Sequence, residues 1–272
     1  MKKLISALFF TIFAAFGSFA QNKMLDSLKN ALGKAPADSN KANILNELGK
    51  LTVFQDPVQA QKYAQEAEDL SKKIKFAKGE AAAYVLRAVV AHNNAKYVEA
   101  IELHQESYRL SQAIGDKEGV ANCYNNLGNN FYKQGDFVKS IENHFAALKI
   151  REAAEDKKGV LNSYNNIGLV YDSQKDLKKA QEYYEKALKI SLELGDRGKE
   201  ANILANLAAI YAATDKEKAL ATNQKVAAIR EEIQDLYGLS SAYRSIAEGF
   251  IDKNDLEKAK EYLEKSISLS KE

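Results

Sequence analysis

The sequence contains no tryptophan, one cysteine and two prolines in 272 residues. With Cys123 as its only cysteine, the chain cannot form an internal disulfide, so its stability must come from packing. Both prolines, Pro36 and Pro57, lie in the first quarter of the chain. Because proline interrupts helices, the long remainder without proline favours an all-helical fold.

A surplus of one charge sign is also missing. The chain has 39 Lys and Arg against 37 Asp and Glu, a net charge of +2, and both signs are mixed along its length. Proteins that bind nucleic acids usually carry a basic patch or stripe, so we expect no nucleic-acid partner. The hydrophobic content of 46% indicates a folded chain and not a disordered one.

Long apolar runs are absent after the N-terminus. At the N-terminus, two lysines precede an apolar run over 4–16, and Ser18 and Ala20 place small residues just before Gln21. This order predicts a secretory signal peptide over 1–20, and hence an exported bacterial protein, periplasmic or secreted. The alternative is an uncleaved anchor, but the run is shorter than the roughly 20 residues that span a bilayer. We expect no stable membrane insertion after cleavage.

A segment of about 40 residues recurs through the rest of the chain. The sequence YNNLG at 124–128 returns as YNNIG at 164–168 and as LANLA at 204–208. Aspartates recur at spacings of 40 or 39 residues in two sets, which gives two turns in each period: Asp136, Asp176, Asp215 and Asp255, and Asp116, Asp156, Asp196 and Asp235. An aspartate can accept hydrogen bonds from the free amide groups at the start of a helix. Each period is therefore predicted to hold two helices.

The first helix of each period carries an apolar stripe and one small residue. Tyr124, Leu127 and Phe131 fall on one face, and Gly128 gives the paired helix room to approach. Cys123 is predicted to be a buried, inert thiol at a packing position of modest size, which other repeats fill with Ser163, Ile203 and Ala242.

These features resemble the tetratricopeptide repeat family, in the long-period subtype of kinesin light chains. The residues that carry the resemblance are the aromatic, Leu-Gly or Leu-Ala positions of the first helix and the Ala or Ser of the second, and they recur over 39–272 as about six repeats. The resemblance implies a right-handed superhelical solenoid of helix-turn-helix repeats whose first helices line a concave groove. Leu25, Leu28 and Leu32 predict an N-terminal capping helix, which with its linker occupies 21–38.

Motifs for catalysis are absent: the chain has no glycine-rich phosphate loop, no HExxH and no GxSxG. We therefore expect no enzymatic activity, no cofactor and no metal. His104 and His144 lie one repeat apart, and Tyr184 takes the third place. This pattern predicts an aromatic packing position, because equivalent atoms on stacked repeats lie about a helix diameter apart, too far to share one ion.

Asparagines form a separate face on the first helices, opposite the apolar stripe. At about 100° per residue, nine of them gather on one side together with Lys133: Asn122, Asn125, Asn126, Asn129, Asn162, Asn165, Asn166, Asn202 and Asn206. Each costs roughly 0.6 kcal/mol relative to Ala inside a helix, or about 5 kcal/mol for all of them, which indicates a use. A carboxamide can pair with both the N–H and the C=O of an extended peptide. Asparagine ladders hold peptide backbones in this way in kinesin light chains, as the resemblance implies.

We interpret the chain as an exported scaffold that binds an extended segment of a partner protein or peptide. Three apolar residues on the same face of the second repeat, Val85, Leu86 and Val89, are predicted to anchor an apolar ligand side chain. The alternative interpretation is that the asparagines bind no ligand and make this surface polar only because it faces solvent. For the whole chain the rival is an extracytoplasmic sensory module of a signal-transduction system, because the layout is similar to tetratricopeptide regions of bacterial sensor proteins. The membrane and output parts of such a system are not in this sequence.

Overall fold

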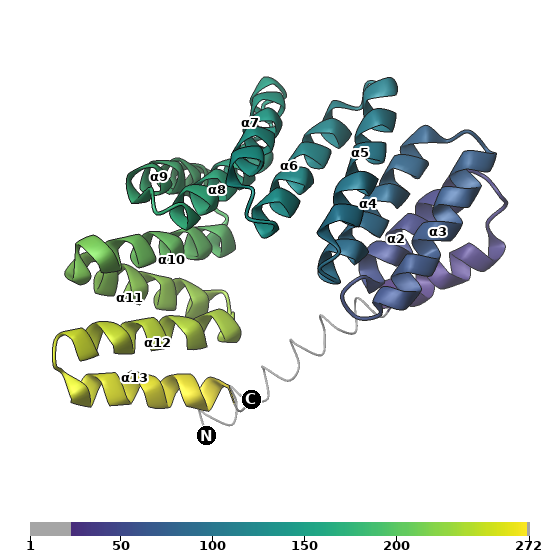
Figure 1. Ribbon diagram of the computed structural model, residues 1–272. Helices are drawn as coiled ribbons and strands as arrows, with labels where there is room; N and C mark the ends of the chain where they lie inside the picture. Colours follow the sequence, from purple (N-terminus) through teal and green to yellow (C-terminus); the bar gives the residue numbers. More distant parts are fainter. Residues whose placement is uncertain (1–22, 271–272) are drawn as a thin grey trace. The chain divides into compact units, whose positions relative to one another are not determined.

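The chain folds into α-helices joined by short turns (Figure 1). The computed structural model describes residues 23–270, and within that range it has 13 helices and no strand. The first helix spans 23–34. The predicted all-α class is confirmed, whereas the predicted signal peptide over 1–20 lies outside the described residues.

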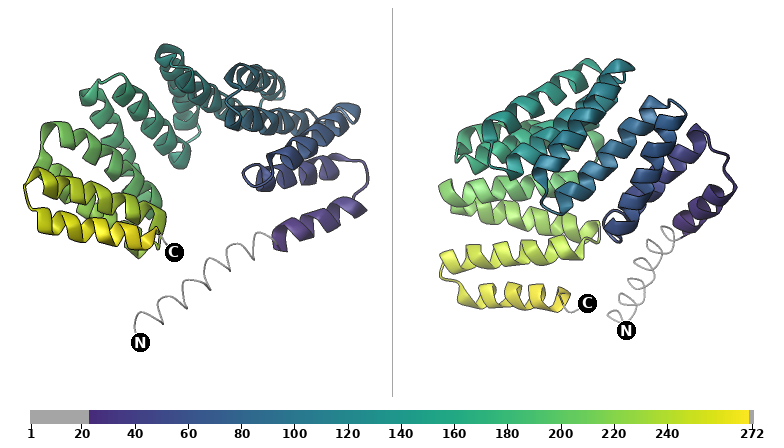
Figure 2. Two further views of the ribbon diagram at one scale, coloured as in Figure 1. Left: turned by 60° about the horizontal axis from the view of Figure 1, so that its bottom comes forward. Right: turned by 45° about the vertical axis from the view of Figure 1, so that its right-hand side comes forward.

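The helices fall into two compact units, Met1–Asp136 and Phe137–Glu272, with the boundary inside the third predicted repeat. The first unit continues with α2 (Ser39–Thr52), α3 (Pro57–Lys73), α4 (Ala77–Asn93), α5 (Tyr97–Ala113) and α6 (Lys117–Lys133). The second unit contains α7 (Phe137–Ala153), α8 (Lys157–Ser173), α9 (Leu177–Leu194), α10 (Arg197–Thr214), α11 (Lys216–Glu232), α12 (Leu236–Asp252) and α13 (Leu256–Leu269). Within each unit, these helices pack against the next one along the chain (Figure 2).

Most turns between helices use the same local device. A residue with positive φ ends one helix, as Gly115 and Gly195 do, and an aspartate then starts the next. The Asp side chain accepts a hydrogen bond from the backbone N–H three residues further on, at 2.9–3.2 Å. The predicted capping role is confirmed at Asp116, Asp156, Asp176, Asp196, Asp215, Asp235 and Asp255.

The shorter period near Asp215 has a structural cause. Helix α10 ends at Thr214 and α11 begins at Lys216, so Asp215 alone joins the two helices. Its φ is −152° and its ψ is 88°, and its side chain accepts from Lys218 N at 2.9 Å. The residue with positive φ that most other turns carry is missing here, and the period between Asp176 and Asp215 is 39 residues.

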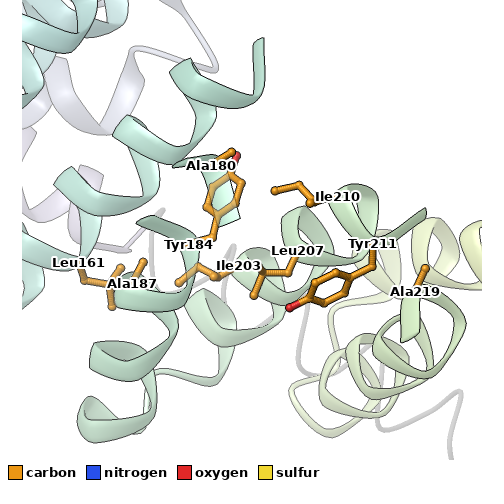
Figure 3. Packing of buried hydrophobic residues seen from close by; sticks show 9 residues of the cluster. All are labelled: Leu161, Ala180, Tyr184, Ala187, Ile203, Leu207, Ile210, Tyr211 and Ala219. Atoms are coloured by element: carbon orange, nitrogen blue, oxygen red, sulfur yellow. The ribbon is translucent and has the colours of Figure 1, made fainter. Parts of the chain in front are cut away.

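The core lies between consecutive helices. Figure 3 shows a cluster in the second unit in which Tyr184 of α9 lies among residues of α8, α9 and α10, including Leu161 and Ile203. His104 and His144 occupy the equivalent place in their repeats, and all three rings are buried. The predicted aromatic packing position is confirmed.

Small residues allow close helix contacts, as predicted. A Cβ added at Gly168 would lie 2.7 Å from the Tyr184 ring, so α8 can approach α9 this closely only with glycine there. Cys123 is fully buried, and its Sγ donates to Ser107 Oγ at 3.3 Å. The predicted burial of Cys123 is confirmed, and burial raises the pKa of its thiol, which favours the protonated form.

The helix at 23–34 covers the first repeat. Leu25, Leu28 and Leu32 pack against a buried cluster that includes Leu45 and Leu48 of α2. The apolar face of α2 is therefore not left open to solvent.

Candidate functional site

The nine asparagines lie on the first helices α6, α8 and α10. Asn122 and Asn202 are exposed and the other seven are half-buried. Leu127 and Ile167, on the opposite side of the same helices, are buried. These helices therefore present amide groups on one face and pack with the other.

In the second unit, two of the predicted amides are brought together. Asn206 Nδ2 donates to Asn165 Oδ1 at 3.3 Å, which links α10 to α8. The other two amide atoms, Asn165 Nδ2 and Asn206 Oδ1, make no hydrogen bond within residues 23–270. One donor and one acceptor are thus left side by side on neighbouring first helices, the pair that an extended backbone needs.

Asn202 belongs to a different cluster. Its Oδ1 accepts from the guanidinium group of Arg230, which also pairs with the carboxylate of Asp235. Asp235 in turn caps α12 by accepting from Gly238 N at 2.9 Å. Sequence reasoning missed Arg230, because it lies on a second helix, 28 residues from Asn202 along the chain.

A pocket of about 610 Å³ opens beside this cluster, among α10, α11 and α12. Its floor is rich in alanine, and α10 supplies Ala205, Ala208, Ala209 and Ala212. The pocket has polar residues at both ends. Near the start of α12 it is lined by Asn202, Arg230 and Asp235, and near the end of α12 by Lys216, Glu248 and Asp252. The volume is within the usual range of ligand pockets, and a few polar groups converge on an apolar floor.

Asn130 has a structural role, unlike its neighbours on α6. It is 1% exposed, its Nδ2 donates to Asn126 O at 2.8 Å, and its Oδ1 accepts from His92 Nδ1 at 2.9 Å. This contact ties α6 to α4. Such a buried, satisfied amide contributes to packing and is not available to a ligand.

The predicted apolar anchor on α4 is only partly at the surface. Leu86 is 3% exposed and packs in a core cluster, where a Cβ on Gly49 would lie 2.1 Å from its Cδ2. Leu86 is thus a core residue in this structure, because glycine in α2 leaves a space that its side chain fills. Val85 and Val89 remain half-buried, and Lys133 is exposed at the end of α6.

Titratable side chains of the described chain do not gather into a metal site, and its two buried histidines are uncharged at neutral pH. Between residues 23 and 270, no three His, Cys, Asp or Glu side chains gather as metal ligands would. Burial lowers the pKa of His104 and of His144 to about 4, so both rings are neutral at pH 7. No helix in that range is long and apolar enough to cross a bilayer.

The repeats match models of a known protein family. A tetratricopeptide repeat model matches residues 79–153, 125–193 and 159–232, and a second such model matches 237–272. The chain belongs to the tetratricopeptide repeat family. It is a TPR array of consecutive helix pairs, the architecture of a protein-interaction scaffold, as the sequence predicted.

Solved structures show the same fold, whereas a sequence search among curated proteins finds no match. The TPR array is similar to kinesin light chain TPR-like repeats from P. anserina, with 15% identity, a TM-score of 0.58 and coverage of 69% of this chain and 93% of that one. The TPR array is also similar to the Rap conjugation gene regulator of plasmid pLS20 in complex with the Phr* peptide. The identity is 15%, the TM-score is 0.66, and the match covers 95% of this chain and 71% of that one.

A third similar structure belongs to a much longer protein. It is a signal transduction ATPase with a tetratricopeptide repeat sensor from Pyrococcus horikoshii, with 22% identity and a TM-score of 0.73. The match covers 90% of this TPR array but only 38% of that protein. Likeness at these identities is a likeness of fold, and function has to be argued from the site.

Proposed function

We propose that this TPR array binds an extended peptide segment of a partner protein through the asparagine faces of its first helices. The observation that carries the proposal is the pairing of Asn165 with Asn206, which aligns a free amide donor and a free acceptor on neighbouring helices. Carboxamides pair with a peptide backbone without reading its side chains. The complex of the Rap regulator with the Phr* peptide, on a similar fold, supports a ligand of this kind.

The first unit offers the same chemistry. The side chains of Asn126 and Asn129 are half-buried on α6 and make no hydrogen bond to other residues between 23 and 270. Two unbonded amides on one helix face lower helix stability without a compensating contact. Binding of a peptide backbone would supply that contact.

Two double variants test the proposal: Asn126→Ala with Asn129→Ala, and Asn165→Ala with Asn206→Ala. Because alanine is the better helix former, the first pair should stabilise the fold by about 1 kcal/mol. Both pairs should weaken peptide binding about tenfold or more, since each lost hydrogen bond contributes about 1 kcal/mol. A stable variant that binds more weakly separates a binding role from a folding role.

The ligand for this test comes from a display library of random peptides selected on the chain Gln21–Glu272. Affinity is measured by fluorescence anisotropy and stability by urea unfolding. Asn143→Ala is the matched control, because Asn143 lies on the second helix α7 and bonds its own helix at Lys139 O. Unchanged affinity in both double variants would contradict the proposal.

We also propose that the chain is exported, on the strength of the N-terminal sequence over 1–20. The same chain serves as bait for partners in the exported fraction of the source cells. The intact mass of the protein recovered from that fraction should correspond to a chain that begins at Gln21.

The alternative function is an input module for signal transduction. The repeat sensor of the Pyrococcus horikoshii ATPase, a TPR array with a similar fold, is the observation that favours it. The two functions are compatible in chemistry, since a sensor of this kind would still bind a ligand. They differ in whether a bound peptide changes the activity of an attached output protein.

A further inference from the structure

We propose that the pocket among α10, α11 and α12 selects the peptide: an aliphatic side chain sits over its alanine floor, and a Lys or Arg close by in the peptide pairs with Glu248. This inference rests on the proposed function and adds a sequence preference to it. It concerns the second unit alone.

The pocket exists because α12 carries smaller side chains than the earlier first helices. Ser241 and Ser245 of α12 stand where α8 has Asn162 and Asn166. Gly249 stands where α10 has the buried Ile210. The two serines are smaller than the asparagines and line the pocket. A Cβ added at Gly249 would lie 3.0 Å from Leu220 Cδ1, so Leu220 of α11 occupies the space that a larger residue at Gly249 would fill.

The floor favours an aliphatic ligand group. Ala205 is half-buried, and Ala209 and Ala212 are exposed, so three methyl groups of α10 face the pocket with little cover. A volume of about 610 Å³ equals roughly twenty water molecules in the liquid. An aliphatic side chain together with its flanking backbone would displace that water from an apolar surface, which favours binding.

Among the charged side chains that line the pocket, one carboxylate has no ion-pair partner within the described residues. Two positive and three negative side chains line it, which gives a net charge of −1: Lys216, Arg230, Asp235, Glu248 and Asp252. Arg230 pairs with Asp235, and Lys216 Nζ lies 3.0 Å from Asp252 Oδ2. Glu248 has no ion-pair partner within residues 23–270. A cationic side chain of the ligand is the complement that the pocket lacks.

The two preferences can be met by one short peptide. Ala209 of α10 and Glu248 of α12 hold the same repeat position on successive first helices, and both line the pocket. An extended chain advances about 3.3 Å per residue. A Lys or Arg within about three residues of the aliphatic residue can therefore reach Glu248 while that residue stays on the floor.

The test is a selection of random displayed dodecapeptides on the full chain Gln21–Glu272 and on two variants. Peptides from the wild type should share an aliphatic residue with Lys or Arg nearby. Glu248→Lys should replace that Lys or Arg by Asp or Glu, and should weaken the best wild-type peptide about tenfold or more. Ala209→Leu, which fills the pocket from an exposed position, should remove the aliphatic preference.

Matched controls are Glu142→Lys on α7 and Ala228→Leu on α11, both exposed and outside the pocket. Glu142→Lys changes the net charge equally, so it accounts for general electrostatic attraction. If both pocket variants select the wild-type motif, the pocket does not read the peptide and the inference is wrong. Should the asparagine pairs still weaken binding in that case, the proposed function survives alone. If no peptide is enriched on any chain, both fail.

Discussion

Single residues set how closely the repeats pack. At Gly168 the contact between helices requires glycine, because the ring of Tyr184 occupies the place that a larger side chain would fill. Gly198 in the first turn of α10 is different, since an added Cβ there would meet only Asp196 Oδ1, at 3.6 Å. The two glycines therefore have opposite expected responses to the same substitution.

Gly168→Ala should lower the free energy of unfolding by about 1–3 kcal/mol, because Tyr184 is fully buried and has no room to move away. Gly198→Ala should be neutral or stabilise by up to about 1 kcal/mol through helix propensity. Urea unfolding followed by circular dichroism measures both. Equal stability of the two variants would show that the contact with Tyr184 is not a constraint.

Residue roles were predictable where they follow from repeat position and not where they depend on a distant neighbour. The buried positions of Cys123 and His144 follow from alignment of the repeats. The repeat pattern predicted Leu86 on the binding face, but its side chain is buried, because Gly49 of α2 has no side chain and Leu86 fills the space beside it. Arg230 of α11 bonds to Asn202 of the preceding helix α10, a contact between residues far apart in the sequence that no local pattern contains.

At the scale of elements, helix ends are fixed by local chemistry. An aspartate side chain satisfies a backbone amide at the start of a helix, and a residue with positive φ ends the helix before it. Both signals lie within a few residues, which is why the aspartates marked the turns correctly. The link at Asp215 depends on one residue, which both follows α10 and caps α11.

Asp215→Ala should lower the free energy of unfolding by about 1 kcal/mol, because it removes the hydrogen bond to Lys218 N. Asp215→Asn keeps a side-chain oxygen and should lose much less. Thermal unfolding of the three proteins at one pH compares them. A loss as large for Asn as for Ala would mean that charge, and not the cap, is what matters at this turn.

At the scale of the whole molecule, the near balance of charge leaves little net repulsion at neutral pH. Between pH 7 and pH 5, buried histidines therefore become important for stability. Each unit contains one, His104 in the first and His144 in the second, and burial lowers the pKa of each to about 4. In the unfolded chain a histidine has a pKa of about 6.5.

Stability should be full above pH 6.5 and should fall as the pH drops from 6.5 toward 4, because only the unfolded chain takes up the protons in that range. The loss is up to about 1.4 kcal/mol per pH unit for each histidine. His144→Tyr, which copies the equivalent Tyr184, should reduce the difference in urea midpoint between pH 7 and pH 5. An unchanged difference would assign the acid response to other groups.

The sequence by itself determined the helices, their pairing into repeats and the face that carries the asparagines, because caps, turns and a recurring apolar stripe act over a few residues. The tertiary structure decided which side chains on that face are available. It placed Leu86 in the core, joined Asn165 to Asn206, and opened a pocket where α12 has smaller residues. These outcomes depend on distances between helices, which are set by the side chains of both partners and not by either helix alone.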